Sequence, residues 1–241
     1  MKNVEYLIGN ENVCNAPLEA YSDEAISFIS DLSGRIMKSP VVRVYPDVAA
    51  LGFWTRKGNI LKLKSNCTEA GLRLGRGLCF HIAPSNIPMS FAFSYMFGVL
   101  AGCANIVRLP SKKFLQTEAA IQVIGETLKD HPEIERRFAF IRYPADNETT
   151  QEFSMKADAR MIWGGDQTVN NIRSLKIRPK CIDIAFSDRY SLCIIDGDAV
   201  LAAEDSRIVR LAEDFYNDTY LMDQNACSSP QIICWKNDSN E

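Results

Sequence analysis

Residues 76–112 read RGLCFHIAPSNIPMSFAFSYMFGVLAGCANIVRLPSK. The segment contains a short apolar run at 76–83, a helix-like stretch at 89–102 and a second apolar run at 105–109, and a proline follows each run. Strand, helix and strand in this order predict a parallel β-α-β unit. Serines and glycines interrupt the apolar stretch at 87–104, so we expect a buried core helix there rather than a membrane span.

The same alternation continues towards the C-terminus. Further strand-like runs are expected at 137–143, 159–163, 181–186, 191–196 and 231–235, and helix-like runs at 114–129, 149–156, 168–175 and 198–221. The strand-like runs are almost continuously apolar, which fits a sheet that is covered on both faces. We therefore predict an α/β fold with a doubly wound, mostly parallel, Rossmann-like sheet.

The part of the chain that precedes this alternation reads as helical and charged. Apolar residues recur at helical spacing in 18–38, and a second helical stretch at 47–64 follows Pro46 and could break near Gly58. The domain ranges that we predict are a helical N-terminal region at 1–74, a nucleotide-binding domain at 75–222 and the start of a further domain at 223–241.

Composition excludes several classes of protein. The 241 residues include 27 Lys and Arg against 30 Asp and Glu, a formal charge of −3, which argues against a dedicated nucleic-acid binder. No CxxC pair occurs and only two histidines are present, so metal-ligand spacing is absent. The N-terminus has no apolar run long enough for a signal peptide. Apolar neighbours suit reduced, buried thiols of a cytoplasmic protein at Cys79, Cys103, Cys181 and Cys193.

The turns that follow the strands are the places to expect a ligand, because doubly wound sheets bind ligands at the carboxyl ends of their strands. Asn86, in the turn after the first strand, could donate its amide to an oxyanion or could simply cap the following helix. Arg108, Ser111 and Lys112, at the end of the next strand, suit a phosphate such as the 2′-phosphate of NADP, although a solvated basic turn has the same composition.

Two later segments also carry possible chemistry. Gly164 and Gly165 separate a strand from the helix that contains Thr168, a geometry that lets backbone approach a phosphate, although the segment matches neither GxGxxG nor the P-loop. Cys227 lies in a run of small and polar residues, so its thiol could be an accessible nucleophile or an inert thiol at a helix end. His81 lies within an apolar strand and is expected to be a core histidine.

The motifs HIAPSNIP, GCANIVRLPSK, IWGGDQTVNNIR and DQNACSSPQ together resemble the aldehyde dehydrogenase superfamily. They are most similar to its bacterial LuxC-type branch of long-chain acyl-CoA and acyl-protein thioester reductases, and the match runs from about residue 48 to 235. The resemblance implies an aldehyde dehydrogenase type of α/β fold in which the catalytic cysteine opens a second domain. Only fourteen residues follow Cys227, so we expect a chain truncated after this cysteine, with the second domain largely missing.

The resemblance also implies roles for the candidate residues. Cys227 would take the acyl group as a thioester, and Asn86 together with the Cys227 backbone N–H would form the oxyanion hole. The residues implied to bind NADPH are Arg108, Ser111 and Lys112, which would hold the ribose and its 2′-phosphate, and Gly164, Gly165 and Thr168, which would line the pyrophosphate and nicotinamide.

Two departures from the superfamily sharpen this expectation. Common aldehyde dehydrogenases have Lys and Glu where this chain has Leu109 and Lys112, and loss of the Glu removes a repulsion towards a 2′-phosphate, which favours NADPH over NADH. Their general-base Glu aligns with Ala185, while Asp183 is near but out of phase. Without that base, hydride rather than water would resolve the acyl-enzyme, as a reductase requires.

The expected function is therefore NADPH-dependent reduction of a long-chain acyl-CoA or acyl-protein to the aldehyde. An acyl-protein synthetase and a thioesterase are possible partners, and a homo-oligomer is possible for a full-length protein; no metal, nucleic acid or membrane span is expected. One alternative is a nucleotide-binding or interaction module without catalysis. A weaker alternative is an aldehyde dehydrogenase that runs in the oxidative direction.

Overall fold

The computed structural model describes residues 4–67, 71–220 and 223–237. The chain divides into two compact units, Met1–Ser187 and Asp188–Glu241. The predicted boundary at 222/223 lies inside the second unit, and Met222 itself is outside the described residues.

A six-stranded sheet forms the centre of the first unit, in the order β1-β4-β3-β2-β5-β6. Its strands are β1 (Glu5–Ile8), β2 (Leu78–Ile82), β3 (Ala104–Leu109), β4 (Phe138–Arg142), β5 (Ala159–Trp163) and β6 (Ile182–Phe186). β2 to β6 are parallel, and β1 pairs with β4 in the antiparallel direction. Every residue of β2 and β4 is buried, as expected for strands that are covered on both faces.

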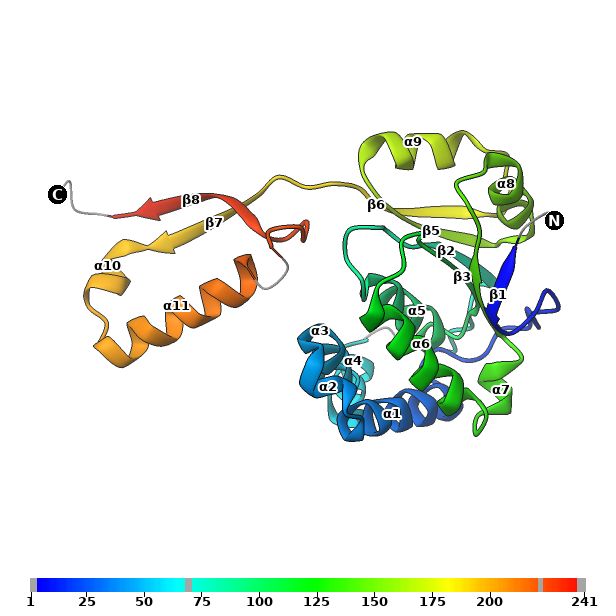
Figure 1. Cartoon of the computed structure of the whole chain (residues 1–241), viewed down its shortest axis with the longest axis horizontal. Coiled ribbons are helices and arrows are strands. Elements are labelled where there is room, and N and C mark those ends of the chain that lie inside the picture. Colours follow the sequence, from blue (N-terminus) through cyan, green and yellow to red (C-terminus); the bar gives the residue numbers. More distant parts are fainter. Residues whose placement is uncertain (1–3, 68–70, 221–222, 238–241) are drawn as a thin grey trace. The chain divides into compact units, whose positions relative to one another are not determined.

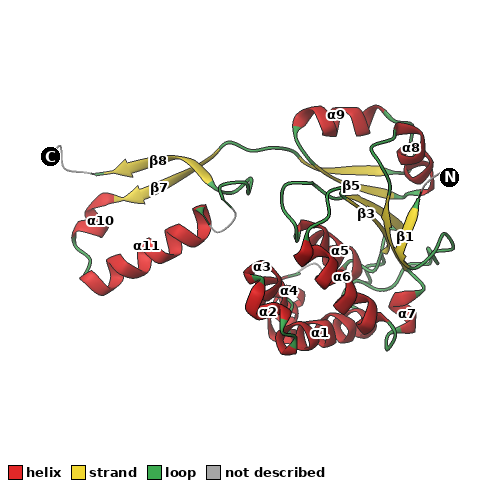
Figure 2. Ribbon diagram, in the orientation of Figure 1, coloured by secondary structure: helices red, strands yellow, loops and turns green. Residues whose placement is uncertain are grey.

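Helices cover both faces of this sheet (Figure 1, Figure 2). The helices on one face belong mainly to the N-terminal part: α1 (Asp23–Lys38), α2 (Val41–Val44), α3 (Pro46–Trp54), α4 (Lys57–Asn66), α5 (Ser90–Leu100), α6 (Leu115–Leu128) and α7 (Pro132–Glu135). The other face carries α8 (Asn147–Lys156) and α9 (Asp166–Ser174). The doubly wound, mostly parallel α/β prediction is confirmed.

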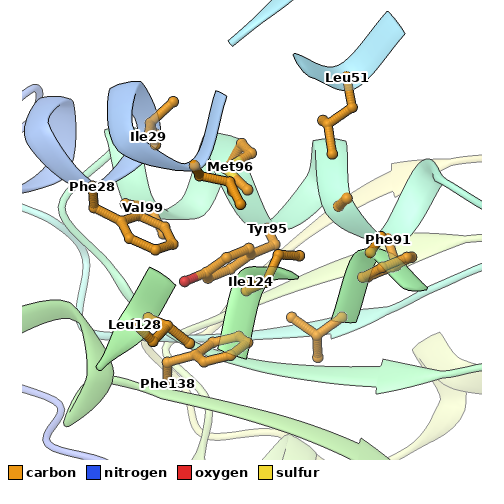
Figure 3. Packing of buried hydrophobic residues seen from close by; sticks show 14 of the residues in the cluster. Phe28, Ile29, Leu51, Phe91, Tyr95, Met96, Val99, Ile124, Leu128 and Phe138 are labelled. Atoms are coloured by element: carbon orange, nitrogen blue, oxygen red, sulfur yellow. The ribbon is translucent and has the colours of Figure 1, made fainter. Parts of the chain in front are cut away.

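Two hydrophobic clusters hold these layers together. The larger cluster joins α1, α3, α5 and α6 to one face of the sheet, and Tyr95 lies at its centre between Phe28 and Phe138 (Figure 3). The smaller cluster packs Phe153, Val169 and Ile172 of α8 and α9 on the opposite face. Burial of apolar surface on both faces of one sheet makes this unit a self-contained domain.

Local sequence explains where the first helix begins and which face it buries. The Ser22 hydroxyl accepts a hydrogen bond from the Ala25 N–H, and acidic residues occupy the first turn, as favours a helix N-terminus. The apolar residues of α1 recur every three or four positions, so one stripe is buried: Ala25, Ile26, Phe28, Ile29, Leu32 and Ile36.

The second unit contains β7 (Ser191–Asp196), α10 (Gly197–Leu201), α11 (Asp205–Thr219) and β8 (Pro230–Lys236). β7 and β8 pair in parallel as a two-stranded sheet. The single helix expected at 198–221 is wrong, because residues 202–204 separate α10 from α11, and Leu221 is outside the described residues.

Other differences from the sequence-based expectations are local. β1 was not expected, because four residues are too short for a periodic signal and its pairing partner β4 is more than 120 residues away. The break in 47–64 falls at Thr55 and Arg56 rather than at Gly58. Cys79 and Cys181 are buried as expected, whereas Cys103 and Cys193 are only partly buried. In the part of the chain that the structure describes, no helix is both long and apolar enough to cross a membrane.

Candidate functional site

The carboxyl edge of the six-stranded sheet collects most of the candidate residues. The chain runs from β2 to β3 to β4 in one direction and then crosses back to place β5 on the other side of β2. The strand order therefore reverses between β2 and β5, where doubly wound folds bind their ligands. The turn of Asn86 follows β2, the basic turn follows β3, and the double glycine follows β5.

Asn86 lies in the exposed turn between β2 and α5. The N-cap position of α5 is occupied by Met89, three residues further on, so Asn86 does not cap this helix. The helix-capping interpretation of Asn86 is therefore wrong. The turn places Asn86 at the switch point, beside the end of the strand that pairs with both β3 and β5.

Arg108 is half-buried in β3, one residue before the strand ends. Its guanidinium carbon lies 4.6 Å from the centre of the Tyr143 ring, a cation–π contact, and its Nε is buried without a hydrogen-bond partner among the described residues. Within that same part of the chain Arg108 pairs with no carboxylate, whereas Arg142 on the adjacent strand pairs with Glu118. A cation held in this way, with a donor unsatisfied, fits an anionic ligand.

Ser111 and Lys112 lie in the exposed turn that follows β3. The Ser111 hydroxyl donates to the carbonyl oxygen of Tyr143 at 3.4 Å, and the Lys112 ammonium lies 4.6 Å from the centre of the Phe114 ring. Arg108, Ser111 and Lys112 therefore lie at the end of β3 and in the turn that follows it, with the two cations over different aromatic rings.

The double glycine connects β5 to α9. A Cβ on Gly164 would lie 3.0 Å from Cγ2 of Thr168, whereas a Cβ on Gly165 would meet no described atom within 4 Å. Gly165 is the N-cap residue of α9 and has no side chain to occupy the first N–H groups of that helix. Open backbone at a helix N-terminus suits a phosphate, although Asp166 places one carboxylate in the same turn.

A buried polar chain lies beneath this edge, between β2, β3 and α5. The Trp163 indole N–H donates to Ser94 Oγ at 3.0 Å, and Ser94 Oγ lies 2.7 Å from Nδ1 of His81. His81 Nε2 in turn lies 2.9 Å from Oδ1 of Asn105. Burial lowers the pKa of His81 from 6.5 to about 4, so this histidine is neutral and belongs to the core, as predicted.

Asp183 and Ala185 lie on β6, where the superfamily's base was aligned. Asp183 makes a bidentate ion pair with the fully buried Arg160, at 2.7 and 2.8 Å. Arg160 also donates to the carbonyl oxygen of Ile172 at 2.9 Å. Because its carboxylate is held by Arg160 on the α9 side of the sheet, Asp183 is a structural residue rather than a free base.

Cys227 belongs to the second unit and lies in the turn between α11 and β8. Its side chain is exposed, as expected, and its carbonyl oxygen accepts a hydrogen bond from Ser191 Oγ at 2.7 Å. Cys67 and Cys234 are exposed as well, so exposure alone does not single out Cys227. Among the described residues, no group of His, Cys, Asp and Glu is arranged to hold a metal ion.

Tyr143 and Ser94 were not among the residues expected at this site. Tyr143 directly follows β4, so the rule that selected the ends of β2, β3 and β5 applies to it as well. Ser94 lies within a helix of small and aromatic residues, and nothing in its sequence neighbourhood indicates that it bonds to both His81 and Trp163.

Comparison with known proteins identifies relatives of this chain. A family model described as Acyl-CoA reductase (LuxC) matches residues 65–241. The long-chain acyl-protein thioester reductase of Vibrio harveyi is 27% identical over 169 residues, which make up 69% of this chain and 33% of that protein. The chain therefore spans about a third of the length of this curated relative.

Solved structures of aldehyde dehydrogenases share the fold. Aldehyde dehydrogenase 21 from Physcomitrella patens superposes with a TM-score of 0.63 at 13% identity, over 91% of this chain and 49% of that chain. The NAD-dependent benzaldehyde dehydrogenase from Corynebacterium glutamicum gives a TM-score of 0.61 at 10% identity, over 95% of this chain and 60% of that chain. At these identities the likeness establishes the aldehyde dehydrogenase type of fold, as predicted.

Proposed function

Because this chain belongs to the acyl-CoA reductase (LuxC) family, we propose that it is part of an enzyme that reduces long-chain acyl thioesters to aldehydes with NADPH. The observation that carries the proposal is the convergence of Asn86, the basic turn and the double-glycine turn on the switch point of the sheet. The thioester substrate would be an acyl-CoA or an acylated protein.

The residues at the carboxyl edge fit a dinucleotide phosphate. The Arg108 guanidinium, which pairs with no carboxylate among the described residues, and the open backbone at Gly165 are both features that suit a bound phosphate group. We propose that Arg108, Ser111 and Lys112 hold the ribose and its 2′-phosphate. Gly164, Gly165 and Thr168 would then line the pyrophosphate and nicotinamide.

The charge of the basic turn favours NADPH over NADH. Arg108 and Lys112 are cations at the end of β3, and neither forms an ion pair with a carboxylate within the described residues. A 2′-phosphate would supply the missing negative charge, whereas a free ribose diol would leave both cations without a partner.

Cys227 would be the nucleophile. Its thiolate attacks the thioester carbonyl, the C–S bond to the carrier breaks, and the carrier thiolate leaves and takes up a proton. Asn86 and the Cys227 N–H would donate to the oxyanion of this step. NADPH, when bound, would supply a hydride to the acyl carbonyl, and Cys227 would then release the aldehyde and regain its free thiol.

The absence of a base on β6 supports reduction over hydrolysis. Ala185 has no ionisable group, and the carboxylate of Asp183 is occupied by Arg160. These two positions therefore offer no free carboxylate that could activate water. This argues against the alternative of an oxidative aldehyde dehydrogenase.

The wider context of the enzyme is also part of the proposal. Residues 1–74 would pack on a cofactor-binding domain at 75–222, and the catalytic domain would begin at 223. We propose a cytoplasmic enzyme, which could form homo-oligomers and have an acyl-protein synthetase and a thioesterase as partners.

One incubation of the chain with a long-chain acyl-CoA and no NADPH measures acylation by intact mass, and a second incubation with NADPH measures aldehyde formation. NADPH binding is measured separately. We expect an acyl adduct that is lost in Cys227→Ser and retained in Cys234→Ser, a matched exposed thiol on β8. An adduct that persists in Cys227→Ser would contradict the role of this cysteine. NADPH binding without any acylation would overturn the reductase and favour a nucleotide-binding module.

A further inference from the structure

We propose that Tyr143 is a positioning residue that sets the preference for NADPH over NADH, because it holds Arg108 and Ser111 in the geometry that a 2′-phosphate requires. The inference rests on the proposed function and adds a residue to it. Tyr143 directly follows β4 and contacts the basic turn after β3, so its effect would be confined to the phosphate end of the cofactor.

Two contacts connect Tyr143 to the basic turn. The Arg108 guanidinium lies over its ring, with 4.6 Å between the guanidinium carbon and the ring centre. The Ser111 hydroxyl donates to its carbonyl oxygen at 3.4 Å. One residue beyond β4 thus contacts two of the three residues proposed to bind the phosphate.

Two residues of α8, Thr150 and Phe153, hold the Tyr143 ring in place. The Thr150 hydroxyl donates to the carbonyl oxygen of Asp146 at 2.6 Å, so it accepts the hydrogen bond from the Tyr143 hydroxyl at 3.1 Å. The ring also stacks on Phe153, with ring centres 6.0 Å apart and planes inclined by 17°. Tyr143 is only 3% exposed, so it offers Arg108 a rigid surface rather than a mobile side chain.

The charges around Tyr143 are compatible with a phosphate. Burial raises the pKa of the Tyr143 phenol, so the ring carries no negative charge at neutral pH. The Asp146 carboxylate is nearby, but it accepts hydrogen bonds from the N–H groups of Glu148 and Thr149 as the N-cap of α8. A guanidinium held by an aromatic face keeps its N–H donors for a ligand, whereas one held by a carboxylate does not.

Arg108 and Arg142, on adjacent strands, have different partners for their guanidinium groups. Arg142, the last residue of β4, directs its guanidinium to Glu118 of α6. Arg108 on the adjacent strand has an aromatic partner instead, the ring of Tyr143. Among the described residues each of the two arginines keeps one buried N–H group without a partner, Nε of Arg108 and Nη1 of Arg142. The two arginines at this edge of the sheet are therefore held by different means, and only the guanidinium of Arg108 has no carboxylate partner within the described residues.

The experiment measures dissociation constants of NADPH and NADH by nicotinamide fluorescence for the wild-type chain and for Tyr143→Leu. We expect NADPH to bind roughly tenfold more weakly to Tyr143→Leu, while NADH changes by less than about twofold, because only the 2′-phosphate depends on Arg108. Tyr143→Phe keeps the ring and should retain the wild-type ratio of the two constants. Circular dichroism verifies that each variant is folded.

A second aliphatic variant, Tyr143→Met, fills more of the buried volume and provides the test if Tyr143→Leu fails to fold. An unchanged ratio in the folded aliphatic variant would overturn the inference and leave the proposed function intact. A ratio that falls equally in Tyr143→Phe would overturn it too, since the ring face would then be irrelevant. If the wild-type chain bound neither dinucleotide, the proposed function would fail and the inference with it.

Discussion

Nε2 of His81 lies 2.9 Å from Oδ1 of Asn105 in the interior between β2, β3 and α5. The Asn105 amide nitrogen donates to the carbonyl oxygen of Cys103, so Oδ1 faces the histidine and accepts its Nε2 proton. Nδ1 then accepts the hydroxyl proton of Ser94, and Ser94 accepts the indole proton of Trp163. All the hydrogen bonds in this series of side chains can form only when His81 is neutral.

The neutral state of His81 predicts a pH dependence of stability. Burial lowers the pKa of His81 to about 4 in the folded chain, against 6.5 in the unfolded chain. At a pH between these two pKa values, His81 is protonated in the unfolded chain but not in the folded chain. The free energy of unfolding therefore falls as the pH falls through this range. We expect a loss of about 3 kcal/mol between pH 7 and pH 4 from this group, measured by urea unfolding.

His81→Gln should remove most of this loss, because glutamine does not titrate. His131→Gln is the matched control: His131 is near the surface and pairs with Asp31, so its replacement should leave the His81 dependence in place. Equal slopes of stability against pH in the wild-type chain and in His81→Gln would show that His81 is not the group responsible.

The hydrogen bond between His81 and Asn105 requires a glycine at position 98. A Cβ on Gly98 would lie 1.9 Å from Oδ1 of Asn105 and 3.0 Å from Nε2 of His81. We expect Gly98→Ala to lower the free energy of unfolding by about 3 kcal/mol, because both buried side chains must shift and lose their hydrogen bond. The control is Gly34→Ala in α1, where a Cβ meets no described atom within 4 Å and alanine should stabilise the helix by up to about 1 kcal/mol. A neutral Gly98→Ala would contradict the close packing described for α5.

Sequence patterns predicted the first unit well because its signals are local. The strands β2 to β6 are apolar runs that end at prolines, glycines or polar residues, and the order of strands and helices specifies a doubly wound sheet. The rule that ligands bind at the carboxyl ends of parallel strands predicts the turns of Asn86, Arg108 and Gly164 at one edge of the sheet. The helix α1 was predictable from its sequence as well, because its apolar residues recur at helical spacing and form one buried stripe.

Features that depend on distant contacts were not predictable. β1 is defined only by pairing with β4, and the role of Tyr143 depends on a side chain from a different strand. Residues 202–204, which separate α10 from α11, include no proline or glycine. The apolar periodicity therefore predicted one continuous helix across them. Asn86 resembled a helix cap in sequence, but the N-cap position of α5 is Met89.

The buried ion pair of Arg160 and Asp183 predicts a large effect from a small substitution. Arg160 is 0% exposed, and Asp183 supplies both oxygens of its bidentate pair. Asp183→Asn would leave a buried guanidinium without a counter-charge, so we expect the free energy of unfolding to fall by about 3 kcal/mol in chemical denaturation. Asp130→Asn removes the same charge from the exposed pair with Arg35 and should cost less than about 1 kcal/mol. Similar losses in the two variants would contradict the structural role of Asp183.

Reversal of charge in the basic turn tests the cofactor preference without disturbing the core. Lys112 is exposed at the end of β3, beside Arg108, and the neighbouring Lys113 is exposed as well. If Lys112 contacts the 2′-phosphate, Lys112→Glu should weaken NADPH binding by roughly tenfold at low salt and leave NADH nearly unchanged, because the repulsion acts on the phosphate. Lys113→Glu makes the same change of net charge one residue away, so it should have a much smaller effect. High salt should reduce the weakening of NADPH binding in both variants, because salt screens exposed charges. The weakening that depends on direct contact between residue 112 and the phosphate should be reduced less than the weakening that depends only on net charge. Equal losses from the two variants would show that the turn attracts NADPH only through its overall charge, and the assignment of Lys112 would then be withdrawn.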